Sequence, residues 1–154
     1  MITQTAEYAL RAITHLALNP DKPQTAQQVA AATHVPLPYL SKVLQLLSRA
    51  GLIQAQRGLH GGFTLLQDTE VLTVYDVVQA VDPIKRIITC PLGFSVHGKD
   101  LCPLHRKLDD AMSLVENSFR STTIADILNE PTKSRPLCPF PAMPIATPLS
   151  DAPK

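Results

Sequence analysis

Residues 37–66 read LPYLSKVLQLLSRAGLIQAQRGLHGGFTLL, and the spacing of their side chains predicts a helix followed by a hairpin. The helix signal is a set of apolar residues at positions i, i+3, i+4 and i+7, namely Leu40, Val43, Leu44 and Leu47. Gly51 is a residue type that commonly closes a helix. Two short β-rich runs, 52–57 and 63–66, then flank the glycine-rich segment at 58–62, which is typical of a hairpin turn.

Helical patterns on both sides of this stretch complete an order of elements. Residues 5–18 carry apolar side chains at helical spacing, and Asn19-Pro20 ends that helix. Thr25 can cap a second helix over 26–34, and a further short helix is predicted at 73–81. Helix, helix, turn, helix and hairpin, in this order, are the parts of a winged helix-turn-helix. We therefore expect a mainly α fold with a small β-hairpin wing.

A second apolar pattern, later in the chain, predicts a long helix of roughly 17 residues. Its stripe repeats at a/d spacing and is widened by Met112 and Phe119. Such a helix outside a small domain needs a partner, and we expect the same helix of a second copy. The alternative is that it packs back on its own domain. The stripe consists of Leu101, Leu104, Leu108, Ala111 and Val115.

Composition divides the chain into four parts. Residues 1–82 form the predicted winged helix-turn-helix domain, and 83–105 form a loop that contains two cysteines. Residues 104–130 hold the dimerisation helix and a terminal turn capped by Thr122 or Thr123. Seven of the 24 residues at 131–154 are proline, without helical or strand period, so we expect a disordered tail. Cys138 lies in this tail and receives no role.

The distribution of charge says more about partners than the formal net charge of +1. Up to Gln67 the chain has five Lys and Arg against two acidic residues, whereas the remainder has nine against eleven. A basic first half suggests that any polyanion is held there. The sequence shows no signal-peptide pattern, and no apolar run approaches the roughly 20 residues that span a bilayer. We expect a cytoplasmic protein without a membrane partner, in which close thiols bind metal or do redox work more often than they form structural disulfides.

The third helix, placed in a major groove, would present an exposed polar face to a duplex. Lys42 and Arg49 can reach phosphates. Ser41 and Gln45 can hydrogen-bond base edges, while Tyr39 can pack on a sugar or a thymine methyl. Each residue alone could be an ordinary solvated side chain, but their combination with the order of helices indicates DNA binding.

Three further positions extend this predicted interface. Thr25 places a helix N-terminus, and therefore free N–H groups, near a phosphate. Arg57 precedes the glycine turn of the hairpin and His60 stands at its tip. An arginine at this place suits a narrow minor groove, where the negative potential is strong.

Residues 90–105, CPLGFSVHGKDLCPLH, hold two of the three cysteines and two of the five histidines. The spacing C-x11-C-x2-H is no general metal signature, so several interpretations stay open. Cys90 and Cys102 can be ligands of an iron–sulfur cluster, ligands of zinc, unligated thiols, or partners in a reversible disulfide. A thiol-redox or zinc enzyme would need a CxxC spacing or a nearby acid/base group, which the loop lacks, and we expect no enzyme.

Four segments together resemble the IscR/NsrR-type bacterial winged-helix transcription regulators of the Rrf family. They are AEYALRAITHLA at 6–17, LPYLSKVLQLLSRAGLI at 37–53, RGLHGGF at 57–63 and DVVQAVD at 76–82. The match runs from about Met1 to Glu130, and its RGxxGGF motif is fairly specific. The resemblance implies a homodimer on a near-palindromic operator of double-stranded DNA, with the long helix making the dimer. It also implies repression as the commoner mode of action.

Members of this family that sense iron, nitric oxide or redox state hold an iron–sulfur cluster. Their loop carries three cysteines, each separated from the next by five residues, and in some a histidine follows three positions after the last. Cys90, Cys102 and His105 match this pattern, whereas the middle position is Val96, which cannot ligate a metal. Glu7 matches a carboxylate that reaches the cluster of the partner subunit.

The implied cofactor is therefore a 2Fe–2S cluster held by Cys90, Cys102, His105 and Glu7 of the partner subunit. His97 is a nearby substitute for His105. In relatives with only two cysteines, a histidine one helical turn after the glutamate completes the set, but here Arg11 stands there and can pair with Glu7 instead. The rival within DNA binding is a cluster-free regulator controlled by thiol redox, a small ligand or a protein partner.

Overall fold

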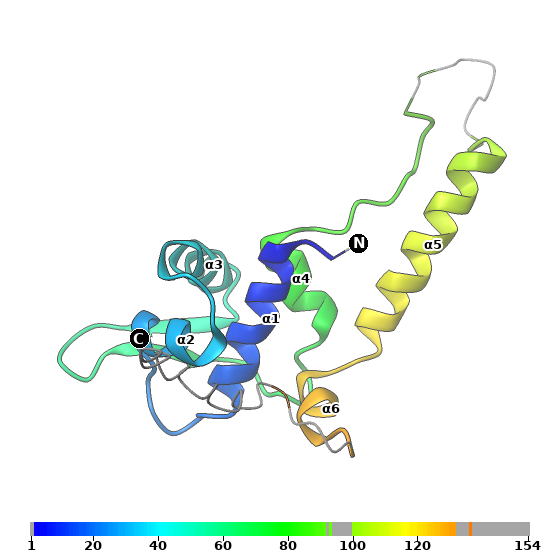
Figure 1. Cartoon of the computed structure of the whole chain (residues 1–154). Helices are drawn as coiled ribbons and strands as arrows, with labels where there is room; N and C mark the ends of the chain where they lie inside the picture. The colour runs from blue at the N-terminus through cyan, green and yellow to red at the C-terminus, as the bar shows by residue number, and fades with distance from the viewer. Residues whose placement is uncertain (1, 92, 94–99, 132–135, 137–154) are drawn as a thin grey trace, which may run out of the picture.

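The computed structural model describes residues 2–91, 93, 100–131 and 136, and its elements follow the predicted order. A two-stranded antiparallel sheet lies among helices, which confirms the mainly α winged helix-turn-helix. Figure 1 shows the hairpin and most helices gathered in one body, from which α5 projects. The elements are α1 (Gln4–Ala17), α2 (Ala26–Thr33), α3 (Leu37–Arg49), β1 (Ile53–Gln56), β2 (Gly62–Leu65), α4 (Val74–Val81), α5 (Pro103–Arg120) and α6 (Ile124–Asn129).

The core of the body forms where α1 and α3 turn their apolar faces toward each other. All four positions of the α3 stripe are buried, as their spacing predicted. On α1 the small side chains of Ala9 and Ala12 are fully buried beside the larger Ile13 and Leu16. Burying one such large side chain contributes about 1.5–3 kcal/mol. This packing fixes the rotation of α3 about its axis and leaves its polar face to solvent.

Three helices begin at threonines that form reciprocal capping boxes. The pairs are Thr25 with Gln28, Thr73 with Asp76, and Thr123 with Asp126. Thr123, rather than Thr122, is therefore the cap of the last turn. Behind it, Ile124 is fully buried in the main core, and its N–H donates to the Leu72 carbonyl at 2.8 Å. The chain thus returns to the body after α5.

The wing keeps its shape through glycines that no other residue could replace without movement. A Cβ on Gly61 would lie 2.3 Å from the carbonyl oxygen of Gln56, and one on Gly62 would lie 2.7 Å from that of Gln24. The backbones of Gln24 and Phe63 exchange hydrogen bonds of 3.0 and 2.8 Å. The hairpin is therefore tied to the segment before α2 by a close backbone approach.

Helix α5 is an arm with few contacts to its own body. It begins at Pro103, after the extended Cys102, so Leu101 lies outside the helix and the predicted stripe is wrong at this first position. The reason is that the residue before a proline is pushed out of the helical region. No residue of this helix is buried, and Phe119 near its end packs against α4. Among the described residues, the stripe positions Leu104, Leu108 and Val115 are therefore exposed, at 64%, 49% and 42%.

Some sequence-based predictions fall outside the described residues. These are Val96, His97, Cys138 and, apart from residues 131 and 136, the tail. Within the part of the chain that the structure describes, no helix has the length and apolar character that crossing a membrane requires.

Candidate nucleic-acid interface and cysteine site

The exposed face of α3 carries the predicted base and phosphate contacts. Lys42, Gln45 and Arg49 are exposed, and the ring of Tyr39 is 62% exposed. They share this face because the apolar stripe turns the other side of the 13-residue helix into the core. A helix of this size fits the major groove of B-form DNA. The face therefore offers two cations, an amide and an aromatic ring to a duplex.

Ser41 makes a local hydrogen bond that limits what it could read. Its hydroxyl donates to the carbonyl of Leu37 at 2.9 Å, which leaves the oxygen lone pairs as acceptors. Acceptors at base edges pair with the amino groups of adenine or cytosine. A base contact by Ser41 would therefore be to one of these two amino groups.

Thr25 uses its side chain for the cap of α2. Its hydroxyl accepts from the N–H of Gln28 at 3.2 Å, and the Gln28 side chain accepts from the N–H of Thr25 at 2.8 Å. The first backbone N–H groups of a helix have no partner within the helix. The groups at this N-terminus that remain for a phosphate are therefore the N–H groups of Ala26 and Gln27.

The wing presents its end residues to solvent. Arg57 and His60 are both exposed, and Leu59 between them is 96% exposed. The N–H of Gly61 donates to the carbonyl of Gly58 at 2.9 Å, which closes a turn with Leu59 and His60 at its two central positions. The wing thus offers an apolar side chain together with a cation.

The wing and α3 are joined through backbone hydrogen bonds. The N–H of Leu52 donates to the carbonyl of Leu47 at 3.0 Å, and the N–H of Leu66 donates to the carbonyl of Leu52 at 3.0 Å. Leu52 itself is buried. The helix and the hairpin therefore hold a fixed geometry relative to each other.

At the N-terminal end of α5, which is the end far from the body, the structure brings together three predicted ligands of one chain. Cys102 is the N-cap residue of α5, and its Sγ lies 3.2 Å from Nδ1 of His105 in the first helical turn. Sγ of Cys90 lies 3.9 Å from the same nitrogen. Both cysteines are free thiols and partly buried. One imidazole nitrogen therefore faces two sulfur atoms.

The donor types suit an iron–sulfur cluster or zinc. Two ligands of one tetrahedral metal lie roughly 3.5 Å apart, given bonds of about 2.0–2.3 Å. The two sulfur–nitrogen distances fall on either side of this value. Among the described residues, however, no group of three His, Cys, Asp or Glu side chains has the arrangement of a metal site. The donors are close together, and a complete site needs a further ligand and a rearrangement.

Glu7 lies on α1 in the body, away from the cysteine site of its own chain (Figure 1). Its carboxylate accepts from Nη2 and Nε of Arg11, at 2.5 and 3.1 Å. Nη1 of Arg11 donates to the carbonyl of Thr33 at 3.2 Å. Within one chain Glu7 is thus the partner of Arg11 and takes no part in the cysteine site.

Arg86 connects the segment before Cys90 to α5. Its guanidinium donates from Nε and Nη2 to the two carboxylate oxygens of Asp109, at 2.7 and 2.6 Å. The N–H of Ile87 donates to the same carboxylate at 2.9 Å. The Arg86 guanidinium and, less strongly, this N–H lower the pKa of Asp109 to about 2. Asp109 in turn raises the pKa of Arg86, so the pair stays ionised at neutral pH.

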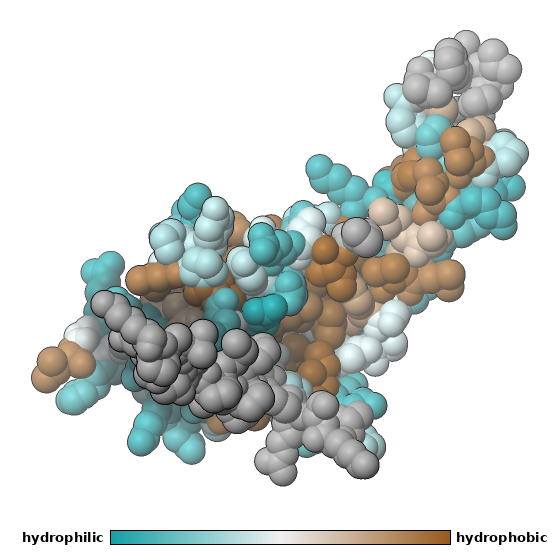
Figure 2. Space-filling model, viewed as in Figure 1, coloured by the Kyte–Doolittle hydropathy of each residue, from teal (hydrophilic) through white to brown (hydrophobic). Residues whose placement is uncertain are grey.

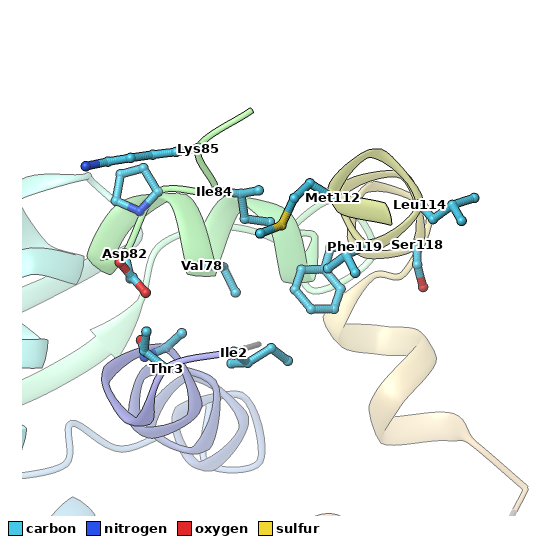
Figure 3. Close-up of a pocket in the computed structure, with 13 residues that line it drawn as sticks. Ile2, Thr3, Val78, Asp82, Ile84, Lys85, Met112, Leu114, Ser118 and Phe119 are labelled. Carbon is cyan, nitrogen blue, oxygen red and sulfur yellow. The ribbon is translucent and has the colours of Figure 1, made fainter. Parts of the chain in front are cut away.

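A hollow opens between the body and the base of α5 (Figure 3). Its volume is about 690 Å³, and Asp82 and Lys85 lie at its polar side. On this face the apolar residues gather between the body and α5 and continue along the helix (Figure 2). Large contiguous patches of exposed apolar surface commonly mark interaction sites. Among its lining residues are Ile2, Val78, Ile84, Met112 and Phe119.

Comparison with known proteins identifies the family. Residues 2–130 match the Rrf2 family, which is described as "Iron-dependent Transcriptional regulator". The chain belongs to the Rrf2 family. It is therefore a DNA-binding transcription regulator, and the alternative of a thiol-redox or zinc enzyme finds no support.

The Rrf2-family assignment agrees with individual relatives. A protein of Aquifex aeolicus (strain VF5), named "Putative HTH-type transcriptional regulator", is 30% identical over 132 residues, which cover 84% of this chain and 92% of that protein. CymR (YrzC), the global cysteine regulator of B. subtilis, superposes with a TM-score of 0.68 at 24% identity, over 82% of this chain and 95% of its own. IscR of T. potens has the same TM-score at 22% identity, over 83% and 85%. The two structures show a shared fold.

Sequence reasoning missed three features of this Rrf2-family chain. The hollow depends on how α5 leaves the body, which no local pattern reports. Leu59 was passed over because a single apolar residue in a turn carries no period. Arg86 and Asp109 are 23 positions apart, and the only available signal was an arginine shortly before the first cysteine.

Proposed function

We propose that this Rrf2-family chain acts in the cytoplasm as a homodimeric repressor whose hold on DNA is controlled by a 2Fe–2S cluster. The observation that carries the proposal is the approach of Cys90 and Cys102 to one nitrogen of His105. Dimerisation would supply what one chain lacks, namely a second recognition helix and a carboxylate ligand. The cytoplasmic location follows from that of chromosomal DNA, and repression follows from the family resemblance.

The DNA interface of this proposal places α3 in the major groove and the wing in the adjacent minor groove. Lys42 and Arg49 would neutralise phosphates, and Gln45 would hydrogen-bond base edges. Two copies related by a twofold axis would read half-sites one helical turn apart, which makes the operator near-palindromic. The proposed contact residues are Thr25 (through its helix N-terminus), Tyr39, Ser41, Lys42, Gln45, Arg49, Arg57 and His60.

The dimer interface of this proposal is the arm. Large apolar side chains stand exposed along it, and Leu114 and Leu104 are 72% and 64% exposed. The hollow at its base continues this apolar surface (Figure 3). Monomeric proteins rarely expose contiguous apolar surface of this kind, and stable interfaces bury roughly 1,200–2,000 Å² in total. We assign this surface to the α5 helix of a second copy.

The ligands of the cluster would be Cys90, Cys102 and His105 of one chain with Glu7 of the partner subunit. Thiolate, imidazole and carboxylate are chemically plausible donors to iron, and the cluster would make the site sensitive to redox state or nitric oxide. For Glu7 to reach the site it has to leave Arg11, which keeps its bond to the Thr33 carbonyl. Loss of the cluster would release its four ligands and free the arm of one chain from the body of the other. The two recognition helices, which have to match fixed half-sites, would then shift relative to each other.

Anaerobic purification followed by iron and sulfide analysis tests the cofactor. We expect about two iron and two sulfide ions per site, with visible absorption that disappears in Cys90→Ser and Cys102→Ser. Cys138→Ser is the matched control and should keep the absorption. A colourless, iron-free protein whose affinity for DNA is unchanged by both substitutions would remove the sensing proposal.

A second candidate is a cluster-free thiol switch, favoured by the free state of Cys90 and Cys102 beside one imidazole. Two thiols would lose two electrons and two protons to a peroxide, which becomes water, and form a disulfide. An oxidized form of CymR from Staphylococcus aureus is among the structures with this fold. Iron analysis together with electrophoresis under non-reducing conditions separates the two candidates.

A further inference from the structure

The segment from Ile84 to Pro91 links α4 to the first cysteine and rises toward the far end of α5 (Figure 1). Ile84 packs against the smaller core cluster at the start of the segment, whereas Ile88, two residues before Cys90, is 80% exposed. In its described residues the polar contacts to α5 come from Arg86, Ile87 and Cys90. Beyond Ile84, these contacts tie the part of the segment that carries Cys90 to α5.

Asp109 is the centre of the attachment. It accepts a two-point fork from Arg86 and a third hydrogen bond from the backbone of Ile87. A planar guanidinium that meets a carboxylate in this way fixes direction as well as distance. The side chain of Asp109 is only 17% exposed, so water competes weakly for it.

Arg86 also reaches a second carboxylate on the same side of α5. Its Nη1 lies 3.5 Å from Glu116, which in turn accepts from Nε and Nη2 of Arg120 at 3.0 and 2.8 Å. The guanidinium of Arg120 stacks over the ring of Tyr75 on α4, 3.4 Å from its centroid. Alternating charges thus connect the segment, the arm and the body.

The spacing of these contacts sets a register. Asp109 follows His105 by one helical turn, and Cys90 follows Arg86 by four residues. Because the segment and α5 run in opposite directions, the pair Arg86–Asp109 and the pair Cys90–His105 hold the segment at two points. The first pair is an ion pair with three hydrogen bonds around one carboxylate, whereas the second is a single sulfur–nitrogen contact of 3.9 Å.

We propose that Arg86 is the positioning residue of the cysteine site, which holds Cys90 beside Cys102 and His105 by fixing its segment on Asp109 of α5. This inference rests on the proposed function only in what the cysteine site binds and controls. The position of the thiols is a property of the metal-free chain and can be measured without a cluster.

Phenylarsine oxide reports this position, because its arsenic binds tightly only where two thiols can reach it together. The arsenic–oxygen bond breaks, two arsenic–sulfur bonds form, and the oxygen leaves as water with the two thiol protons. The experiment uses the full metal-free chain with Cys138→Ser as background. We expect Arg86→Met, which keeps the aliphatic stem, to weaken binding of the arsenical at least about 10-fold. The affinity of Arg86→Lys should lie between those of the background protein and Arg86→Met.

Lys107→Met is the matched control, because Lys107 is a cation on α5, the helix that Arg86 contacts, and it is 84% exposed and makes one ion pair of 3.8 Å. It should bind the arsenical like the background protein. If Arg86→Met does not keep its helical circular dichroism, Asp109→Asn takes its place, with a several-fold loss expected. Unchanged binding in a folded variant overturns the proposal. A wild-type protein without iron refutes the cofactor but leaves this result standing.

Discussion

Asp109 shows how much one residue can carry, since a single carboxylate accepts from both the side chain and the backbone of the cysteine segment. Sequence alone presents it as one of two adjacent aspartates on a solvated helix. In the structure Asp109 is 17% exposed and paired with Arg86, whereas the neighbouring Asp110 is 58% exposed. The difference arises because only one of two successive helix positions faces the segment.

Acid should release this contact. The folded-state pKa of Asp109 is lowered to about 2, so its contribution to stability is complete above its ordinary pKa near 4 and is lost as the pH falls through about 2. We expect a carbon-13 titration of this carboxyl to have its midpoint near 2, and a higher midpoint in Arg86→Met, below the ordinary value near 4 because the Ile87 N–H still donates to it. Asp109→Asn identifies the signal by removing it. A midpoint near 4 in both proteins would show that the ion pair is absent in solution.

Among the elements, α3 separates stability from recognition on its two faces. Leu44 and Leu47 are buried in the core, while Lys42 and Gln45 point to solvent. Because the stripe repeats with the helical period, the same feature that builds the core also selects which side chains can meet a groove. Substitutions on the polar face should therefore act on DNA binding and leave folding unchanged.

Lys42→Met tests this separation. We expect the slope of log affinity against log salt concentration to fall in magnitude by about 0.9, as one phosphate contact is lost. The free energy of unfolding should change by less than about 0.5 kcal/mol. Fluorescence anisotropy with a labelled duplex measures the slope and urea unfolding measures stability. Lys107→Met removes a cation from α5 and should leave the slope unaltered; equal slopes in all three proteins would contradict the predicted role.

The whole molecule has a body with a buried apolar core and an arm in which no residue is buried. Phe119 anchors the base of the arm, and Ile124 returns the chain to the core just after it. Between its N-terminal end and Phe119, α5 exposes its apolar face, so in a single copy this face is in contact with water. This imbalance is a property of the assembled chain, and it is the reason for assigning the face to a second copy.

Charges on the arm should separate the copies. We expect Leu108→Glu with Val115→Glu to convert the protein from dimer to monomer in sedimentation at micromolar concentration, because a buried unpaired carboxylate costs several kcal/mol. DNA affinity should fall with it, since each monomer has one recognition helix. Lys107→Glu is the charge control on an 84% exposed side chain and should stay dimeric. A wild-type chain that sediments as a monomer would refute the assignment.

Much of the candidate site could be predicted because its parts are local. Cys102 and His105 are three residues apart at a helix start, so their spacing alone places sulfur near imidazole. Cys90 joins them across 15 residues, and its place depends on the path of its segment. The Glu7–Arg11 pair was also foreseeable from i,i+4 spacing, which is why the alternative to a ligand role for Glu7 could be stated in advance.

By itself the sequence determined the order of helices, the rotation of α3 and the starts of the helices that Thr25 and Thr73 cap. These features follow from periods of a few residues and from side chains that bond to their own backbone. Only the tertiary structure decided that α5 stands off the body, that a hollow opens at its base, and that Arg86 meets Asp109. Those outcomes depend on the angle at which one element leaves another, and that angle is set by packing between residues far apart in the chain.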